Sequence, residues 1–431
     1  MGTIKTEGPS LPLRRFRPRV MVLRFLLPLS IAACLTLPLA VFSSKGLAPL
    51  FALTAVAAIA HFFIARRAFP PTPVRLGMGF ATFLLLAGLS ALWSLTPAQS
   101  FQAVWPLAGI LFGITVLAGV ARALDDMDRT QAQTALLGGF FVGLALMAIE
   151  AAFGFPVSRT GASLLNIKAG FSVWMLKPAA TIAALLLWPT LVLLHRKGFR
   201  WPALLVVATG TVAIIGLIKS DAAILGLILG GAVFGLTMHW SRMMGPALGA
   251  ILAVLMISAP WVPMLFPDPR ISMTGIEYLP NSAVHRILIW QTTAEHIHKR
   301  PWLGHGFDTS RSLYPSGTSK TVHFARPTIG KSGGVAAEPI PLHPHNMALQ
   351  IWLELGAIGA GIALAAPLAM VAAVSRARLE RMEQAASYGF LVTVIAIAVV
   401  AYGAWQAWWL SAIGLCGALF VAVLSRSPKT A

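Results

Sequence analysis

Long apolar segments recur along almost the whole chain, separated by short polar turns. They lie near residues 20–42, 46–64, 76–93, 102–121, 133–153, 170–194, 202–218, 222–239, 244–266, 344–374, 387–402 and 405–425. A helix needs roughly 20 mostly apolar residues to cross a membrane. Because backbone groups in lipid must be hydrogen-bonded within the segment, such runs are helices. The pattern therefore predicts an all-α polytopic membrane protein with about twelve transmembrane helices.

Composition supports lipid as the solvent of this chain. Of 431 residues, 57% are hydrophobic and 11% are charged, whereas soluble domains carry roughly 25% charged residues. Both cysteines, Cys34 and Cys416, lie inside apolar segments, where we interpret them as small hydrophobic residues. The formal net charge of +19 would suggest a nucleic-acid partner in a soluble protein.

The placement of the basic residues gives a different explanation of that charge. If the N-terminus is cytoplasmic, most Lys and Arg residues fall in cytoplasmic segments, including the clusters at 14–19, 66–75, 196–200 and 376–381. This is the positive-inside pattern of inner-membrane proteins. We predict that both termini are cytoplasmic and that nucleic acid is not a partner.

One large loop departs from this pattern. Residues 267–341 are predicted to lie outside, between the ninth and tenth spans, yet they contain more basic than acidic residues. Either this loop is solvated and attracted to anionic lipid head groups, or it holds an anionic group at the outer membrane surface. The predicted organisation is a basic cytoplasmic N-terminus (1–19), nine spans (20–266), the periplasmic loop (267–341), three spans (342–425) and a cytoplasmic tail (426–431).

The segment that closes the loop contains the most informative polar residues. Pro344 suits the first turn of a helix, which places His345 and Asn346 at a helix N-terminus near the outer surface. Free backbone N–H groups there favour anions, and an imidazole exchanges protons near neutral pH. His345 is a candidate general base or phosphate partner; alternatively, these residues only cap the helix. A metal site is disfavoured, because His343 and His345 have no further ligands nearby.

A second candidate lies on a predicted amphipathic helix inside the loop. Ala283, Ile287, Trp290 and Ile297 share one side of residues 281–300, and Arg286 falls at its margin. The guanidinium matches the geometry of phosphate oxygens. The alternative is an arginine that only contacts lipid head groups.

Charged residues near the outer ends of two spans form a third group. Lys177 and the Lys219-Ser220-Asp221 trio would add charge to an outward-facing cavity, unless Lys219 and Asp221 simply pair. Asp125, Asp126 and Asp128 fit a solvated cytoplasmic turn. No P-loop, G-x-S-x-G or dinucleotide fingerprint occurs.

Three motifs together resemble the O-antigen ligase and polymerase family. The first is the run from His345-Asn346 through Leu349-Gln350 and Glu354-Leu355-Gly356 to Ile358-Gly359. The second is the arginine–tryptophan helix followed by Pro301-Trp302-Leu303-Gly304-His305-Gly306-Phe307, and the third is Ser90-Ala91-Leu92-Trp93-Ser94. Their order, and the large loop between the ninth and tenth spans, extend the resemblance along most of the chain.

The resemblance implies glycan transfer from an undecaprenyl-pyrophosphate carrier at the periplasmic face, by an inverting reaction without metal or cofactor. In a ligase the acceptor is a sugar hydroxyl of lipid A–core, and in a polymerase it is another carrier-linked repeat. His345 matches the family's catalytic histidine. Arg286 matches the loop arginine that neutralises the pyrophosphate leaving group.

The ligase is the leading hypothesis, with an O-antigen or exopolysaccharide polymerase as its alternative and a lipid-linked glycan transporter as the alternative from another class. The chain departs from the family at a mid-span arginine, where it has Lys219-Ser220-Asp221. Lys219 or Lys177 is a candidate to replace that charge. His343, Asn346 and Arg300 complete the predicted substrate-binding residues.

Overall fold

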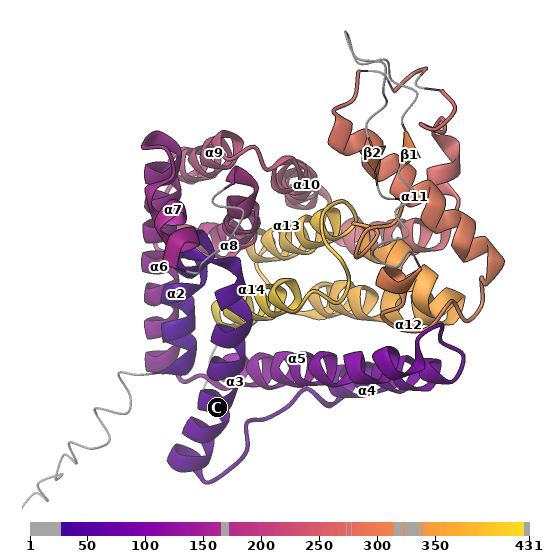
Figure 1. Cartoon of the computed structure of the whole chain (residues 1–431). Helices are drawn as coiled ribbons and strands as arrows, with labels where there is room; N and C mark the ends of the chain where they lie inside the picture. The colour runs from indigo at the N-terminus through magenta and orange to yellow at the C-terminus, as the bar shows by residue number, and fades with distance from the viewer. Residues whose placement is uncertain are drawn as a thin grey trace, which may run out of the picture.

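The computed structural model describes residues 27–164, 172–272, 274–276, 278–313, 322–323, 336–337 and 339–425. Helices make up most of this part of the chain, and the all-α class is confirmed (Figure 1). The principal helices are α2 (Pro28–Phe42), α3 (Leu47–Arg66), α4 (Val74–Leu89), α5 (Pro97–Ala123), α6 (Asp126–Ala152), α7 (Pro156–Leu164), α8 (Lys177–Arg196), α9 (Trp201–Leu217), α10 (Asp221–Ser258), α11 (Asn281–Lys299), α12 (Met347–Arg376), α13 (Arg381–Ala398) and α14 (Ala407–Leu424). Two-residue strands β1 (Val322–His323) and β2 (Ala336–Ala337) pair in an antiparallel arrangement.

The apolar segments of the sequence correspond in order to these helices. Eight helices in the described ranges are long and apolar enough to cross a membrane, and α2 and α9 are apolar but shorter. The predicted segments 222–239 and 244–266 meet in the single helix α10, which is kinked at Trp240 (φ −123°, ψ 49°). The predicted termini, 1–19 and 426–431, lie outside the described residues, so the number of spans and the topology stay predictions.

Helix α8 runs through the centre of the bundle and is buried almost along its whole length. Glycines on the surrounding helices allow close packing: a Cβ added to Gly389 would lie 2.6 Å from a ring carbon of Trp188. At its C-terminal end, Arg196 forms an ion pair with the buried Glu383 of α13. The N-terminal end of α8, which begins at Lys177, lies at the other end of the helix.

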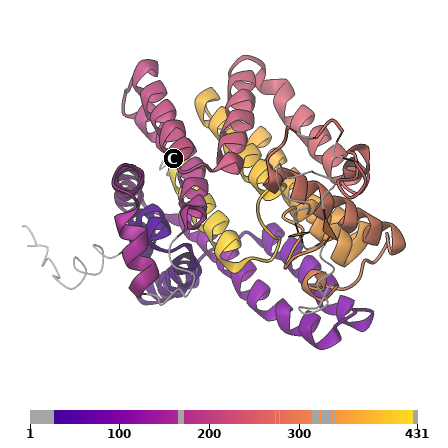
Figure 2. The ribbon, with the colours of Figure 1, turned by 45° about the horizontal axis from the view of Figure 1, so that its top comes forward.

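The loop helix α11 lies beside the start of α12, and both views show it at one end of the bundle (Figures 1 and 2). Its apolar side is buried and includes Val284, Ile287, Leu288 and Ile297. Arg286 lies at the margin of this side and is half-buried. The fold therefore brings the loop arginine towards the segment that contains His345.

Candidate active site

His345 lies immediately before α12 and has an unusual backbone conformation. Its φ is 55°, in the left-handed region that few residues other than glycine adopt, although histidine is enriched there among the non-glycine residues. The backbone N–H of His345 donates to Nδ1 of His343 (3.2 Å). Such conformations cost about 1–3 kcal/mol and cluster at functional sites.

The hydrogen bond of the His345 ring determines which nitrogen is available for chemistry. Nδ1 lies 2.9 Å from the carbonyl oxygen of Ala401, and because a carbonyl only accepts, Nδ1 carries the proton. In the neutral ring the lone pair is then on Nε2. Within the described part of the chain, no hydrogen bond engages Nε2. His345 is therefore arranged to accept a proton at Nε2.

Helix α11 is tied to this segment through a tryptophan. Trp290 Nε1 donates to the carbonyl oxygen of Pro344 (3.0 Å). Arg286 lies one helical turn before Trp290, and residues at this spacing share a helix face. The bond therefore directs Arg286 towards His345, and the positive charge of Arg286 lowers the pKa of the His345 ring.

The Arg286 guanidinium is half-buried and available to bind an anion. Burial lowers its pKa, while Asp221 and Tyr402 oppose this effect. Among the described residues, no hydrogen bond or ion pair engages the side chain. A buried charge without a partner is costly, and a pyrophosphate would supply the missing acceptors.

One expectation about the start of α12 needs correction. The helix begins at Met347, so Pro344 lies before the helix and not in its first turn. Asn346 is the N-cap, and its side-chain oxygen accepts a hydrogen bond from the Leu349 N–H (3.1 Å). The structure thus gives Asn346 a capping role, and its contact with substrate stays a prediction.

His343 supports His345. Its Nδ1 accepts the His345 N–H, and its Nε2 lies 2.7 Å from the side-chain amide of Gln406. Burial, with the nearby His345 and Arg311, lowers the pKa of His343 to about 3. His343 is therefore neutral at physiological pH, and both of its ring nitrogens have protein partners.

The turn between α13 and α14 (residues 399–406) forms the other side of the site and was missed in the sequence. Besides the Ala401 carbonyl, it contributes Tyr402, whose hydroxyl lies 3.0 Å from Thr181 Oγ1 of α8. Gly403 packs against the His343 ring so closely that a Cβ there would lie 2.7 Å from Cγ. The sequence carried no signal for the turn, because it has no charged residue and its main contribution is a backbone carbonyl.

The environment of His345 predicts a shifted pH dependence. Burial is the largest cause that lowers the pKa of His345 below 6.5; Arg286 and His285 lower it further, and the bond to Ala401 opposes them. The neutral form, which accepts protons, is therefore still the major form at pH 6.5. We expect the fall of the reaction rate at low pH to have its midpoint below pH 6.5.

A pH–rate profile in membrane vesicles measures the fall of the rate at low pH, which we call the acidic limb. Arg286→Gln removes a positive charge beside His345, so the limb should move towards higher pH in the residual activity of that variant. A wild-type limb centred at or above the ordinary histidine value would contradict the assignment.

A fully buried carboxylate of the first motif binds the loop and the α13–α14 turn. Glu354 accepts hydrogen bonds from the Asp308 N–H (2.6 Å), Trp405 Nε1 (2.6 Å), Gln350 Nε2 (3.0 Å) and the Ser310 hydroxyl. We call these five residues the Glu354 cluster. Because each donor comes from an element that borders the site, the cluster fixes the loop and the α13–α14 turn to α12.

The motif that begins at Pro301 is held between the other two. His305 and Gly306 donate their backbone N–H groups to the carbonyls of Leu353 and Glu354, each at 2.9 Å. On the other side, the Phe307 N–H donates to Ser90 Oγ (2.9 Å), and Trp93 Nε1 donates to the carbonyl of Leu303 (3.1 Å). These motifs therefore build the support of the site.

Gly356 is the position in this support where substitution should be most damaging. Its φ of 62° and ψ of −161° are essentially restricted to glycine, and a Cβ would lie 2.3 Å from the carbonyl carbon of Trp302. We expect Gly356→Ala to destabilise the protein by about 3 kcal/mol, measured as a fall in the melting temperature in detergent. Gly361→Ala is the matched control: nothing lies within 4 Å of its Cβ position, so no loss is expected, and an equal loss in both variants would contradict the argument.

Comparison with known proteins gives a family for most of this region. Residues 204–364 match the family model described as O-antigen ligase. The resemblance to the O-antigen ligase family is confirmed. The matched segment contains α10, α11 and the start of α12, and with them Arg286 and His345.

Curated proteins extend the similarity beyond that segment. A Rickettsia felis protein named "Putative polysaccharide ligase" is 28% identical over 346 residues, which cover 78% of this chain and 78% of the relative. A similarly named protein of Rickettsia conorii is 26% identical over 340 residues, covering 78% of this chain and 75% of that protein. The similarity thus includes most of both chains.

The basic residues proposed to replace the O-antigen ligase family's mid-span arginine lie at the ends of two helices. Lys177 is half-buried at the start of α8, and Lys219 is exposed just before α10, with a φ of 57°. Lys219 does not form an ion pair with Asp221, although both residues are described. Instead, the charge of Asp221 acts on Arg286.

Arg300 lies apart from the other candidates. It follows the last residue of α11 and is exposed, about 20 Å from Arg286 at 1.5 Å of rise per residue. We therefore assign it no role beside His345.

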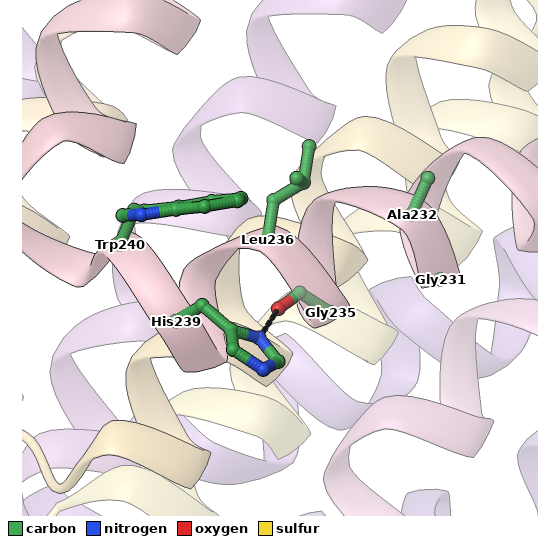
Figure 3. Close-up of a pocket in the computed structure, with 6 residues that line it drawn as sticks. All are labelled: Gly231, Ala232, Gly235, Leu236, His239 and Trp240. Carbon is green, nitrogen blue, oxygen red and sulfur yellow. Dashed lines mark hydrogen bonds between the residues drawn. The ribbon is translucent and has the colours of Figure 1, made fainter.

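An apolar groove on α10 is also separate from the site. Gly231, Ala232, Gly235, Leu236, His239 and Trp240 line it (Figure 3). The dashed line in that view is the bond from His239 Nδ1 to the Gly235 carbonyl (2.9 Å). These residues lie about 15–30 Å along the helix from Asp221, so the groove contributes no group to the site around His345.

Proposed function

We propose that this protein is an O-antigen ligase that transfers a glycan from an undecaprenyl-pyrophosphate carrier to a sugar hydroxyl of lipid A–core at the periplasmic face of the inner membrane. Family similarity indicates a polysaccharide ligase. The single observation that carries the finer proposal is the pairing of a proton acceptor, His345 Nε2, with Arg286, a half-buried cation that lacks a protein partner among the described residues.

The acceptor hydroxyl is activated at His345. The hydroxyl oxygen attacks the anomeric carbon of the donor sugar while its proton passes to Nε2. Nδ1 remains bonded to the Ala401 carbonyl, which orients the ring and stabilises the imidazolium that forms. The proton later leaves to water, and the neutral ring is restored.

The bond from the anomeric carbon to the pyrophosphate oxygen breaks as the new glycosidic bond forms. Its electron pair goes to that oxygen, so the negative charge on the pyrophosphate increases in the transition state. Arg286 stabilises this charge, and a half-buried cation does so more strongly than a solvated one. The products are the glycosylated acceptor and undecaprenyl pyrophosphate, with no nucleotide consumed.

Genetic complementation tests the function. The gene is deleted in its host, and the wild type or His345→Ala is returned before envelope glycans are analysed. A ligase predicts that the deletion removes long chains from lipid A–core while carrier-linked glycan accumulates, and that His345→Ala fails to reverse this. Glycans shortened to single repeats, or loss of an exopolysaccharide, would identify a polymerase. Full rescue by His345→Ala would reject the mechanism and favour a transporter.

A further inference from the structure

The residue after Ala401 has a hydroxyl with no role in the mechanism above. Tyr402 packs edge-on against Trp408, with ring centroids 4.7 Å apart, and lies 5.1 Å from the Trp409 ring. Its hydroxyl reaches across to α8, where it lies 3.0 Å from Thr181 Oγ1. The aromatic contacts hold the ring, and the hydroxyl links the turn to the central helix.

The direction of this hydrogen bond follows from the number of available protons. Thr181 has one hydroxyl proton, which it donates to the Lys177 carbonyl oxygen of its own helix (3.1 Å). Thr181 Oγ1 must then accept from Tyr402. The chain of donors therefore runs from Tyr402 to Thr181 to the backbone of α8.

This chain begins at the residue next to the carbonyl that orients the His345 ring. Ala401 and Tyr402 are consecutive, so fixing the Tyr402 side chain to α8 restrains the peptide unit that accepts from His345 Nδ1. On the following side, the Ala404 N–H donates to Gln350 Oε1 (2.8 Å) and Trp405 belongs to the Glu354 cluster. The Ala401 carbonyl thus lies between two attachments, one to α8 and one to α12.

We propose that Tyr402, through its hydrogen bond to Thr181, is a positioning residue that aims the Ala401 carbonyl at His345 and so keeps the ring in its Nδ1–H form. This inference rests on the proposed function, because it assigns a support to its general base. Tyr402 acts through Ala401 and does not accept the proton itself.

The test compares Tyr402→Phe with Thr181→Val in membranes of the deletion host, which supply accumulated donor and acceptor. Each variant keeps the shape of its side chain and removes the shared bond. We expect the maximal rate of transfer to fall roughly threefold to tenfold, the effect of one hydrogen bond, while the donor KM stays within about twofold. The double variant should be no slower than the slower single variant, because both changes break one interaction.

A pH profile separates positioning from general damage. The groups that face His345 are Arg286 and His285 from α11 and His343 from its own loop, and these remain in place. The hydrogen bond from His345 Nδ1 to the Ala401 carbonyl favours the charged ring and raises its pKa. If the carbonyl is less well aimed, that pKa falls, so the acidic limb should move to lower pH in both variants. A variant that is only less well folded would give less active protein with an unchanged limb.

Tyr388→Phe is the matched control. Tyr388 is fully buried on α13, and its hydroxyl lies 2.7 Å from Ser375 Oγ of α12. At 1.5 Å of rise per residue, Tyr388 lies about 20 Å from Ala401 along the direction of α13. Its removal should leave the acidic limb unchanged.

The outcomes distinguish the inference from the function on which it rests. If His345→Ala is inactive but Tyr402→Phe has the wild-type rate and limb, only the positioning role is rejected. Additive losses in the double variant would reject it as well. If His345→Ala retains activity, the proposed general base fails whatever Tyr402→Phe shows.

Discussion

His345→Ala is expected to reduce the rate of glycan transfer by about 10²–10⁴-fold, the contribution typical of a general base. The variant lacks the imidazole beside Arg286. Within the described residues, Nε2 of that ring has no hydrogen-bond partner and can accept the proton. Binding of undecaprenyl pyrophosphate to the purified protein should change little, since Arg286 is retained. The measurement is therefore the transfer rate in membranes together with product affinity in detergent.

A second substitution at this position separates lost chemistry from lost structure. His345→Asn keeps a residue type that tolerates the left-handed backbone, so it should fold like the wild type and still lack activity. His298→Ala is the matched control, because His298 is an exposed histidine of the same loop whose Nδ1 is likewise bonded to a backbone carbonyl (Ala294, 2.7 Å). Substantial activity in His345→Asn would show that another group takes the proton.

Arg286→Ala should lower the transfer rate by about 10²–10³-fold, as expected when a preorganised donor to a developing charge is removed. The rate should fall more than the affinity for undecaprenyl pyrophosphate-linked donor, because the leaving group gains charge as the bond breaks. Arg286→Lys keeps the charge without the planar geometry and should be intermediate. Transfer rates and donor KM values for both variants measure this order.

Arg300→Ala provides the comparison for Arg286. Both arginines belong to the α11 region, but Arg300 is exposed at its far end, so its loss should have little effect. Equal losses at the two positions would indicate that the basic loop acts through its total charge, as a surface attracted to anionic lipid would.

The sequence predicted those features that depend on local pattern. The spans follow from the length of apolar segments, and the kink at Trp240 is the place where two of them merge into α10. The motif resemblance pointed to His345 and Arg286, but not to the place where α12 begins. The positive φ of His345 lies just before that helix, and the Pro344 carbonyl accepts a hydrogen bond from Trp290, 54 residues away in the sequence.

The partners of His345 could not have been predicted in the same way. The Ala401 carbonyl is a backbone group 56 residues away, and any residue would provide one. Tyr402 and Thr181 are 221 residues apart and carry no motif. The predicted ion pair between Lys219 and Asp221 does not form, because proximity in sequence did not bring the two side chains together. Instead, the charge of Asp221 acts on Arg286 of another helix and raises its pKa.

The Glu354 cluster has a consequence for how proteins related to this chain can diverge. The loop is attached to α12 at Asp308 and Ser310, and it joins that helix again at Asn346. The Glu354 carboxylate also holds Gln350 of α12 and Trp405 of the α13–α14 turn. A substitution at one of the five positions of this cluster therefore leaves the rest of the cluster without a matched partner, so we expect related proteins to change these positions together or not at all.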